Sequence, residues 1–244
     1  MKICSISDLH GNLIYYPSDY WKELWECEVL FICGDILPLS VQSHMPNSLA
    51  WLLDDFIPWV EGLPVEKVFL IAGNHDFWFE RYDEKAHELF PTHGKVTYLN
   101  NEVAEYCSSQ DGNTYRFFGS PYCHIFGNWP FMRSEQILEQ KFGEIPENVD
   151  VLFTHDAPYG TSDICFEGWS ADGRHKGCPA LRDAVIAKSP KYHFHGHLHS
   201  TNHNEEWLCK TRVYNTSILN EEYKITYNPL YLRITKENAD ENND

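Results

Sequence analysis

Short apolar runs recur along the chain, and each of them stops at a polar turn. Residues 29–33 (VLFIC), 68–72 (VFLIA) and 151–154 (VLFT) are the clearest, and weaker runs occupy residues 1–7 and 191–194. Apolar runs of this length, rich in β-branched and aromatic residues, are typical of strands that are buried on both faces. The pattern therefore predicts five short strands in a central sheet.

The segments between these runs have helical character. Four helices are expected, at residues 49–60, 83–89, 134–142 and 179–187. Strands that alternate with helices in this way indicate an α/β fold.

The last part of the chain differs, because residues 207–234 contain strand-like pieces and no helical pattern. They predict a second sheet, with strands at residues 212–215, 224–227 and 231–234. Residues 236–244 are polar and acidic and are expected to form a disordered tail. No repeat or linker divides the rest of the chain, so we expect a single domain over residues 1–235.

Composition adds size and charge to this picture. The chain has 244 residues, of which 43% are hydrophobic and 15% aromatic, enough for a large packed interior. Its 36 acidic residues outnumber its 19 basic residues and give a formal net charge of −17. Such a surface repels phosphate backbones and anionic lipids, so neither duplex nucleic acid nor a membrane is an expected partner. Composition leaves the oligomeric state undefined.

The cysteines and the N-terminal segment favour a reducing compartment. Eight cysteines are spread over the chain without a CxxC pair. Residues 1–12 lack the apolar stretch of a secretion signal, and no run reaches a membrane-spanning length. Free, mostly buried thiols and a cytoplasmic location are therefore expected.

All five predicted strands end in side chains that can bind metal ions. These side chains are Asp8, His10, Asp35, Asn74, His155, His197 and His199. Because ligands of such sheets bind at the carboxyl ends of the strands, the side chains are expected to meet in space. Mixed oxygen and nitrogen donors suit divalent Mn, Fe, Zn or Mg, and the set exceeds the needs of one tetrahedral ion. We therefore expect two metal ions that share a ligand.

These residues lie in sequence blocks whose order resembles a known family. DLH (8–10), GD (34–35), GNHD (73–76), TH (154–155) and GHLH (196–199) follow one another in the chain. In this order they are similar to the signature of calcineurin-like metallophosphoesterases. The stretches THDAPYGTSDICFEG, GCPAL and PKYHFHGHLH look most like the metallophosphoesterase-domain group, which is class III phosphodiesterase-like. The resemblance implies a four-layer α/β/β/α sandwich of two mixed sheets flanked by helices.

The same resemblance implies roles for the individual residues. Asp35 is implied to bridge two divalent ions, with Mn as the first choice and Fe, Zn, Mg or Ni as alternatives. His75, next to the ligand Asn74, is implied to be a catalytic histidine that binds no metal. The first ion is assigned to Asp8, His10 and His199, and the second to Asn74, His155 and His197.

The expected reaction is hydrolysis of a small phosphate ester by metal-bound hydroxide. Two cations about 3.5–4 Å apart lower the pKa of a bridging water and neutralise the charge that builds in the transition state. His75, when protonated, can donate to the leaving oxygen or to the phosphoryl group. A phosphodiester, including cyclic nucleotides, is favoured, and a small phosphomonoester or nucleotide is the alternative. A non-catalytic interaction module stabilised by metal is a third hypothesis, and its signature, a missing ligand or catalytic histidine, is not found.

One departure from the wider family concerns the environment of His75. After Asp35 the chain reads Ile-Leu-Pro-Leu, without the second aspartate that pairs with the catalytic histidine in Ser/Thr protein phosphatases. The departure argues against a protein phosphatase. It also leaves the partner of His75 unassigned.

The loop at residues 159–178 follows the TH block and is a candidate cover for the site. Arg174 and His175 are its candidate substrate-binding residues, because an arginine can pair bidentately with a phosphate. Phe166 or Trp169 could stack on a base. Core packing is instead expected for three aromatic residues of another segment, which are Tyr122, Trp129 and Phe131.

The stretch HFHGHLHS at residues 193–200 holds four histidines at alternate positions. Gly196 permits backbone angles that a strand does not need, and it is expected to mark the turn. His197 and His199 then lie on the exit loop as ligands. His193 and His195 are expected to be structural residues of the strand or to support the ligands.

Overall fold

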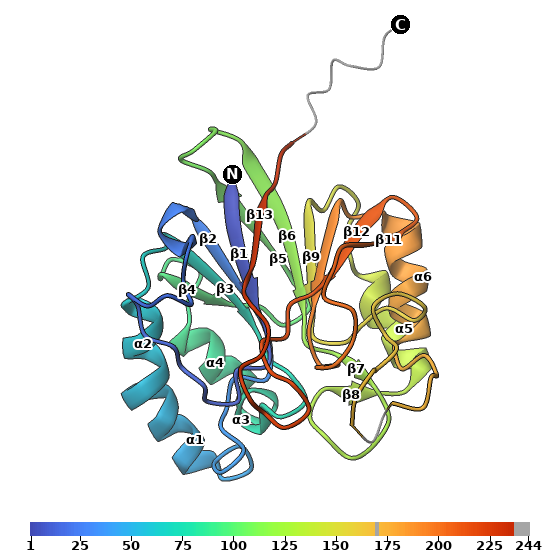
Figure 1. Cartoon of the computed structure of the whole chain (residues 1–244), viewed down its shortest axis with the longest axis horizontal. Coiled ribbons are helices and arrows are strands. Elements are labelled where there is room, and N and C mark those ends of the chain that lie inside the picture. Colours follow the sequence, from blue (N-terminus) through green and yellow to red (C-terminus); the bar gives the residue numbers. More distant parts are fainter. Residues whose placement is uncertain (169–170, 237–244) are drawn as a thin grey trace, which may run out of the picture.

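Two β-sheets lie face to face at the centre of the molecule, and helices cover the outer side of each sheet (Figure 1). The computed structural model describes residues 1–168 and 171–236. Helix, sheet, sheet and helix follow one another across Figure 1, so the predicted four-layer α/β/β/α fold is confirmed. The expectations for Trp169 and for residues 237–244 of the acidic tail lie outside the described residues.

The first sheet contains β1 (Lys2–Ile6), β2 (Val29–Cys33), β3 (Lys67–Ile71), β4 (Val96–Tyr98) and β13 (Leu230–Arg233). Its spatial order is β13-β1-β2-β3-β4. Strands β1 to β4 run parallel, and β13 pairs with β1 in the antiparallel direction. Every residue of β2 is buried, as expected for a central strand with a continuous apolar sequence.

The second sheet contains β5 (Glu102–Cys107), β6 (Thr114–Ser120), β9 (Val151–Thr154), β10 (Tyr192–His195), β11 (Glu206–Leu208) and β12 (Thr211–Asn215). Its spatial order is β11-β12-β10-β9-β6-β5. The four inner strands are parallel, and the two edge strands pair in the antiparallel direction. Both large sheets are therefore mixed, as the family resemblance implied.

The helices are short and lie close to the predicted positions. They are α1 (Met45–Trp51), η2 (Leu52–Phe56), α2 (Ile57–Glu61), α3 (Phe77–Arg81), α4 (Asp83–Leu89), α5 (Glu135–Gly143) and α6 (Pro179–Lys188), with a 3₁₀ turn η1 (Leu24–Glu26) and a two-stranded ribbon of β7 (Cys123–His124) and β8 (Met132–Arg133). The segment η2 is π-helical, and the amide of Ile57 donates to the carbonyl of Leu52 just before Pro58. Pro58 has no amide hydrogen, and the π-helical turn is a local adjustment just before it. The elements α1, η2 and α2 therefore form one continuous helical segment.

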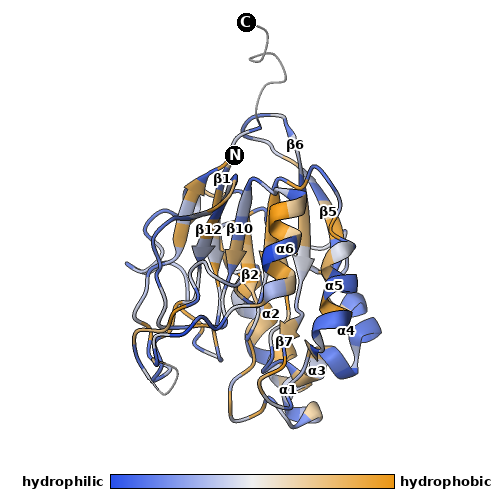
Figure 2. Cartoon of the chain, turned by 90° about the vertical axis from the view of Figure 1, so that its right-hand side faces the viewer, coloured by the Kyte–Doolittle hydropathy of each residue, from blue (hydrophilic) through white to orange (hydrophobic). Residues whose placement is uncertain are grey.

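Alternate residues of the strands fill the space between the two sheets with aromatic rings. Phe31 of the first sheet lies 5.0 Å from Phe117 and 5.1 Å from Phe153 of the second sheet, measured between ring centroids. The other face of the same strands packs against helices, as Leu30 does. Figure 2 shows hydrophobic colour concentrated in the strands and hydrophilic stretches on α4 and α5. This packing fixes the two sheets relative to each other, and so it also fixes the positions of the ends of their strands.

The division of strands between the sheets differs from the sequence prediction. The five apolar runs do not form one sheet, because β1, β2 and β3 lie in the first sheet and β9 and β10 in the second. A separate sheet from residues 207–234 is also wrong, since β13 joins the first sheet and β11 and β12 extend the second. The piece at 224–227 forms only an isolated bridge between Leu219 and Ile225.

Most of the cysteines are buried, and the helices are short. Six of the eight cysteines are buried, as expected, and Cys107 and Cys209 are exposed. Among the described residues, no helix combines the length and apolar character needed to cross a bilayer.

Candidate metal centre

The loops that follow five parallel strands meet at one end of the two sheets, at the lower side of Figure 1. Strands β1, β2 and β3 reach this end from the first sheet, and β9 and β10 reach it from the second. The site therefore lies where two sheets converge, rather than along the edge of one. The loops bring together all seven predicted ligands, which are Asp8, His10, Asp35, Asn74, His155, His197 and His199.

One group of ligand atoms comes from Asp8, His10 and His199. Each offers an atom that lies within 4.8 Å of the other two, and all three residues are buried. His199 donates from Nδ1 to the carbonyl of Asn220 at 3.1 Å, which leaves Nε2 facing Asp8 at 3.5 Å. A backbone contact that fixes the ring in this way is typical of metal-binding histidines.

Asp35 lies between this group and the remaining ligands. Its Oδ2 is 3.5 Å from His10 Nε2 and 3.4 Å from His155 Nε2. His155 donates from Nδ1 to the carbonyl of Cys33 at 2.8 Å, and its Nε2 lies 3.0 Å from Asn74 Oδ1. The carboxylate thus occupies the place that a bridging ligand requires.

His197 completes the set from the second sheet. It is partly buried, and its ring lies 5.2 Å from the ring of His155. Its backbone amide donates to both carboxylate oxygens of Asp8, at 3.1 and 3.0 Å. This contact connects the loop after β10 to the loop after β1. The backbone of the second sheet thereby holds the Asp8 side chain of the first sheet in place.

The donor set fits a pair of divalent cations. Both ring nitrogens of His10 are buried without a hydrogen-bond partner, although buried polar atoms are normally paired. The atoms that surround His10 are carboxylate oxygens and imidazole nitrogens, the donors that borderline divalent metals prefer. The eight cysteines contribute no atom to either ligand group.

Four of the ligands have backbone angles that L-residues rarely adopt. Asp8, His10, Asp35 and His197 have φ values of 58°, 42°, 53° and 66°. Each left-handed residue costs on the order of 1–3 kcal/mol, and such residues cluster at functional sites. These backbone conformations therefore lower the local stability of the loops, and they direct the four side chains toward the same site.

A comparison with known proteins agrees with this geometry. The sequence profile of calcineurin-like phosphoesterases matches residues 1–201. The chain belongs to the calcineurin-like phosphoesterase family. Members of this family use two divalent metal ions to hydrolyse phosphoric ester bonds, so the chain is a metal-dependent phosphoesterase.

Several relatives in the family are similar over most of the chain. A UPF0046 protein of Caenorhabditis elegans is 29% identical over 234 residues, which cover 89% of this chain and 79% of the nematode protein. Metallophosphoesterase domain-containing protein 1 of Homo sapiens is 29% identical over 189 residues, 70% of this chain and 54% of that protein. This chain thus spans about half the length of the human relative.

Solved structures share the fold at low sequence identity. The TT1561 protein of Thermus thermophilus has a TM-score of 0.57 and 14% identity, with 88% of each chain covered. GAP50, described as the anchor in the inner membrane complex of Plasmodium, has a TM-score of 0.52 and 13% identity over 94% of this chain and 76% of that chain. These likenesses concern the fold alone.

The electrostatics of the phosphoesterase site keep both carboxylates ionised. Burial would raise the pKa of Asp8 and of Asp35, but the adjacent histidines outweigh it and hold both pKa values far below their usual range. Burial would lower the pKa of His155 and of His199, yet Asp35 and Asp8 respectively raise these pKa values well above the usual range. Each of these histidines thus holds a proton that a cation would displace, so metal binding releases protons.

The catalytic candidate His75 has a neutral partner. Its Nδ1 lies 2.6 Å from Gln42 Oε1, and its backbone amide donates to Asp35 Oδ1 at 2.7 Å. The ring packs against Trp129 at 4.6 Å and against His10 at 4.9 Å. Gln42 therefore occupies the place that the missing second aspartate left unassigned, and no sequence motif marks it.

Asp76, the last residue of the GNHD block, ties two ligand loops together. Its carboxylate accepts from the backbone amides of Ile36, Leu37 and Gly73 at 2.8 to 3.2 Å. Burial, together with the nearby charge of Asp35, raises its pKa to about 7. The motif contained this residue, but its role depends on contacts with a loop 40 residues away.

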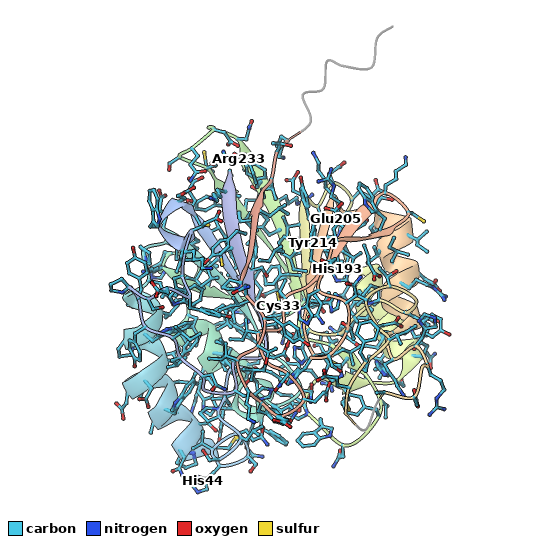
Figure 3. All side chains as sticks on the ribbon, viewed as in Figure 1. Cys33, His44, His193, Glu205, Tyr214 and Arg233 are labelled. Carbon is cyan, nitrogen blue, oxygen red and sulfur yellow. The ribbon has the colours of Figure 1, made fainter. Side chains whose placement is uncertain are left out.

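Gly196 corrects the interpretation of the histidine-rich stretch. Its φ is not left-handed, and the turn lies one residue later, at His197. A Cβ on Gly196 would lie 1.9 Å from Ser7 Oγ and 2.5 Å from Asp8 Oδ2. The glycine is therefore needed for close approach of two strands. His193 lies on β10 (Figure 3), and its Nε2 is 2.8 Å from Thr154 Oγ1, in line with a structural role.

Replacing Gly196 with alanine is expected to displace Asp8 and to weaken metal binding. Overpacking of this kind costs about 1–3 kcal/mol, which lowers Tm by several degrees. Differential scanning fluorimetry and Mn²⁺ titration measure the two effects. Gly143→Ala is the matched control, since a Cβ there meets nothing within 4 Å. Equal Tm and metal affinity in the two variants would contradict the close-approach argument.

The ligands open into a cavity of about 540 Å³ with an aromatic rim. Phe126 packs against His197 at 5.1 Å, and Tyr223 packs against His10 at 4.9 Å. Trp129 also lines the cavity, so the expectation of core packing is wrong for it. That expectation is confirmed for two other aromatic residues, which are Tyr122 and Phe131.

Arg174 and His175 lie apart from this cavity. The Arg174 guanidinium is exposed and pairs with Asp172, and His175 Nδ1 lies 2.7 Å from Asp163 Oδ1. Of this loop, the lining includes Cys165 and Lys176 but neither of the two predicted residues. Substrate contact by Arg174 and His175 stays a prediction.

Proposed function

We propose that the chain hydrolyses a phosphodiester, with cyclic nucleotides among the candidate substrates, and that manganese is the ion of its metal pair. The resemblance of the sequence to class III phosphodiesterase-like proteins supports the diester. So do the charge and the surface chemistry of the cavity.

The charge of the cavity wall carries the proposal. Among the described residues that line the cavity, Lys176 is the one lysine or arginine, and Asp172 pairs with it at 2.8 Å. A phosphomonoester has close to two negative charges at neutral pH, whereas a diester has one. A wall with little fixed positive charge beyond the metal ions favours the single charge, and the aromatic rim favours a second organic group.

The chain's own residues hold and orient the reacting groups. Two divalent cations, when bound, lower the pKa of water and neutralise charge on the phosphoryl oxygens. Asp35 is proposed to hold the two ions together, and the six other ligands to hold one ion or the other. His75 lines the cavity with Nδ1 engaged by Gln42, so its Nε2 is proposed to contact the phosphoryl group.

The alternatives predict different measurements. A phosphomonoesterase would prefer p-nitrophenyl phosphate to bis(p-nitrophenyl) phosphate, and a non-catalytic module would turn over neither. With Mn²⁺ present, we expect kcat/KM for the diester to exceed that for the monoester by about tenfold or more. Metal-stripped protein is the control and is expected to hydrolyse neither ester. A preference for the monoester would overturn the diesterase proposal.

A further inference from the structure

A second histidine faces the cavity from outside every sequence motif. His124 lies on β7, lines the cavity, and leaves 24% of its side chain exposed. Its Nδ1 is 2.7 Å from Oδ2 of Asp156, a carboxylate that is fully buried. This is a histidine–carboxylate pair at the cavity whose members are not candidate metal ligands.

Backbone contacts hold this pair rigidly. The Asp156 carboxylate also accepts from the amide of His124 through Oδ2 and from the amide of Ala157 through Oδ1, both at 2.9 Å. Asp156 directly follows the ligand His155, so the pair is anchored to the metal centre by one peptide bond. Since Nδ1 is engaged, Nε2 is the ring nitrogen of this cavity-lining residue that remains available.

The partner of His124 differs in charge from the partner of His75. His75 contacts the neutral amide of Gln42, whereas His124 contacts the carboxylate of Asp156. The charge of Asp156 raises the pKa of His124 despite its burial, and Glu135 adds to the effect. An imidazole whose Nδ1 contacts a carboxylate is suited to hold a proton on the ring and to act as a general acid.

We propose that His124 is a second catalytic residue, which donates its Nε2 proton to the leaving oxygen of the phosphoester. The proposal rests on the proposed phosphoesterase function. As the bond between phosphorus and the leaving oxygen breaks, its electron pair stays on that oxygen and the His124 proton joins it to form an alcohol. The oxygen of water becomes bonded to phosphorus, and the proton that water loses restores His124. His75 then remains available for the phosphoryl group.

The test compares two diesters that differ only in how much their leaving group needs a proton. Bis(p-nitrophenyl) phosphate releases a stable nitrophenolate, whereas diphenyl phosphate releases a phenolate as basic as that of tyrosine. For His124→Gln we expect kcat on the nitrophenyl ester to fall by no more than about threefold. On diphenyl phosphate we expect a fall of about 10²-fold or more, the range of general acid catalysis. His93→Gln, an exposed histidine, is the matched control and is expected to change neither rate.

Each outcome separates the role of His124 from other causes. Equal losses on the two esters would indicate a structural role and overturn the proposal, as would no loss on either. Asp156→Asn is expected to reproduce the selective loss on diphenyl phosphate, with bound Mn²⁺ measured to confirm that the neighbouring ligand is intact. A wild-type protein that hydrolyses neither ester with Mn²⁺ bound would overturn the phosphoesterase proposal itself, and this one with it.

Discussion

The His75→Ala variant is expected to lose kcat by about 10²–10⁴-fold while it still binds two metal ions. The ring of His75 lines the cavity, and in our assignment it binds no metal. Its backbone amide, which alanine retains, donates to Asp35 Oδ1 and so preserves the position of the carboxylate that we propose as the bridge. Hydrolysis of bis(p-nitrophenyl) phosphate, with bound manganese measured on the same sample, tests both parts.

A graded control exists for this variant. Gln42→Ala removes the amide that orients the ring but leaves the ring in place, so a smaller loss of kcat is expected. Loss of bound metal in His75→Ala would show that the ring supports the ions instead of the reaction. Unchanged kcat would contradict a catalytic role for His75.

The Asp35→Asn variant is expected to lose metal binding and metal-dependent stability together. Asp35 Oδ2 lies about equally far from His10 Nε2 and His155 Nε2, so we expect this carboxylate to contact both ions. The substitution replaces it with an uncharged amide. Removal of a contact that only supports a ligand costs 10–100-fold in metal affinity, and loss of a bridging ligand is expected to cost more, on the order of 10²-fold or above. Turnover should fall below detection.

Thermal unfolding gives the clearest readout of this second variant. Ligands at about 100 times their Kd stabilise a protein by about 2.7 kcal/mol, so a chelator should lower the Tm of the wild type. The Tm of Asp35→Asn should be insensitive to the chelator. Asp172→Asn changes an aspartate of the 159–178 loop and should respond to the chelator as the wild type does. A wild-type response in Asp35→Asn would refute the bridging role.

The candidate metal ligands could be located from the sequence because each follows a strand that the apolar pattern marks. Asp35 ends the run at β2 and His155 ends the run at β9, and no knowledge of the fold is needed to find them. The assignment of these runs to two sheets was not predictable. Runs buried on both faces look alike in either sheet. In β5 and β6 polar residues interrupt the apolar ones, so no continuous apolar run marks these strands.

The residues around the ligands depend on contacts between distant segments. Gln42 meets His75 across 33 residues, and His124 meets Asp156 across 32. Neither pair has a spacing that local geometry imposes, so only the packed structure brings its members together. Gly196 is a similar case. The sequence shows that it lies in the motif, but only the packed structure shows that it lies against Ser7.

The central claim is that two metal ions held by these side chains drive ester hydrolysis. The direct measurement is titration of metal-stripped protein with Mn²⁺, with bound ions and turnover of bis(p-nitrophenyl) phosphate followed in the same samples. The account predicts two ions per chain and turnover that appears only as the second ion binds. Full turnover by the metal-free protein, or saturation of turnover by a single ion, would contradict it.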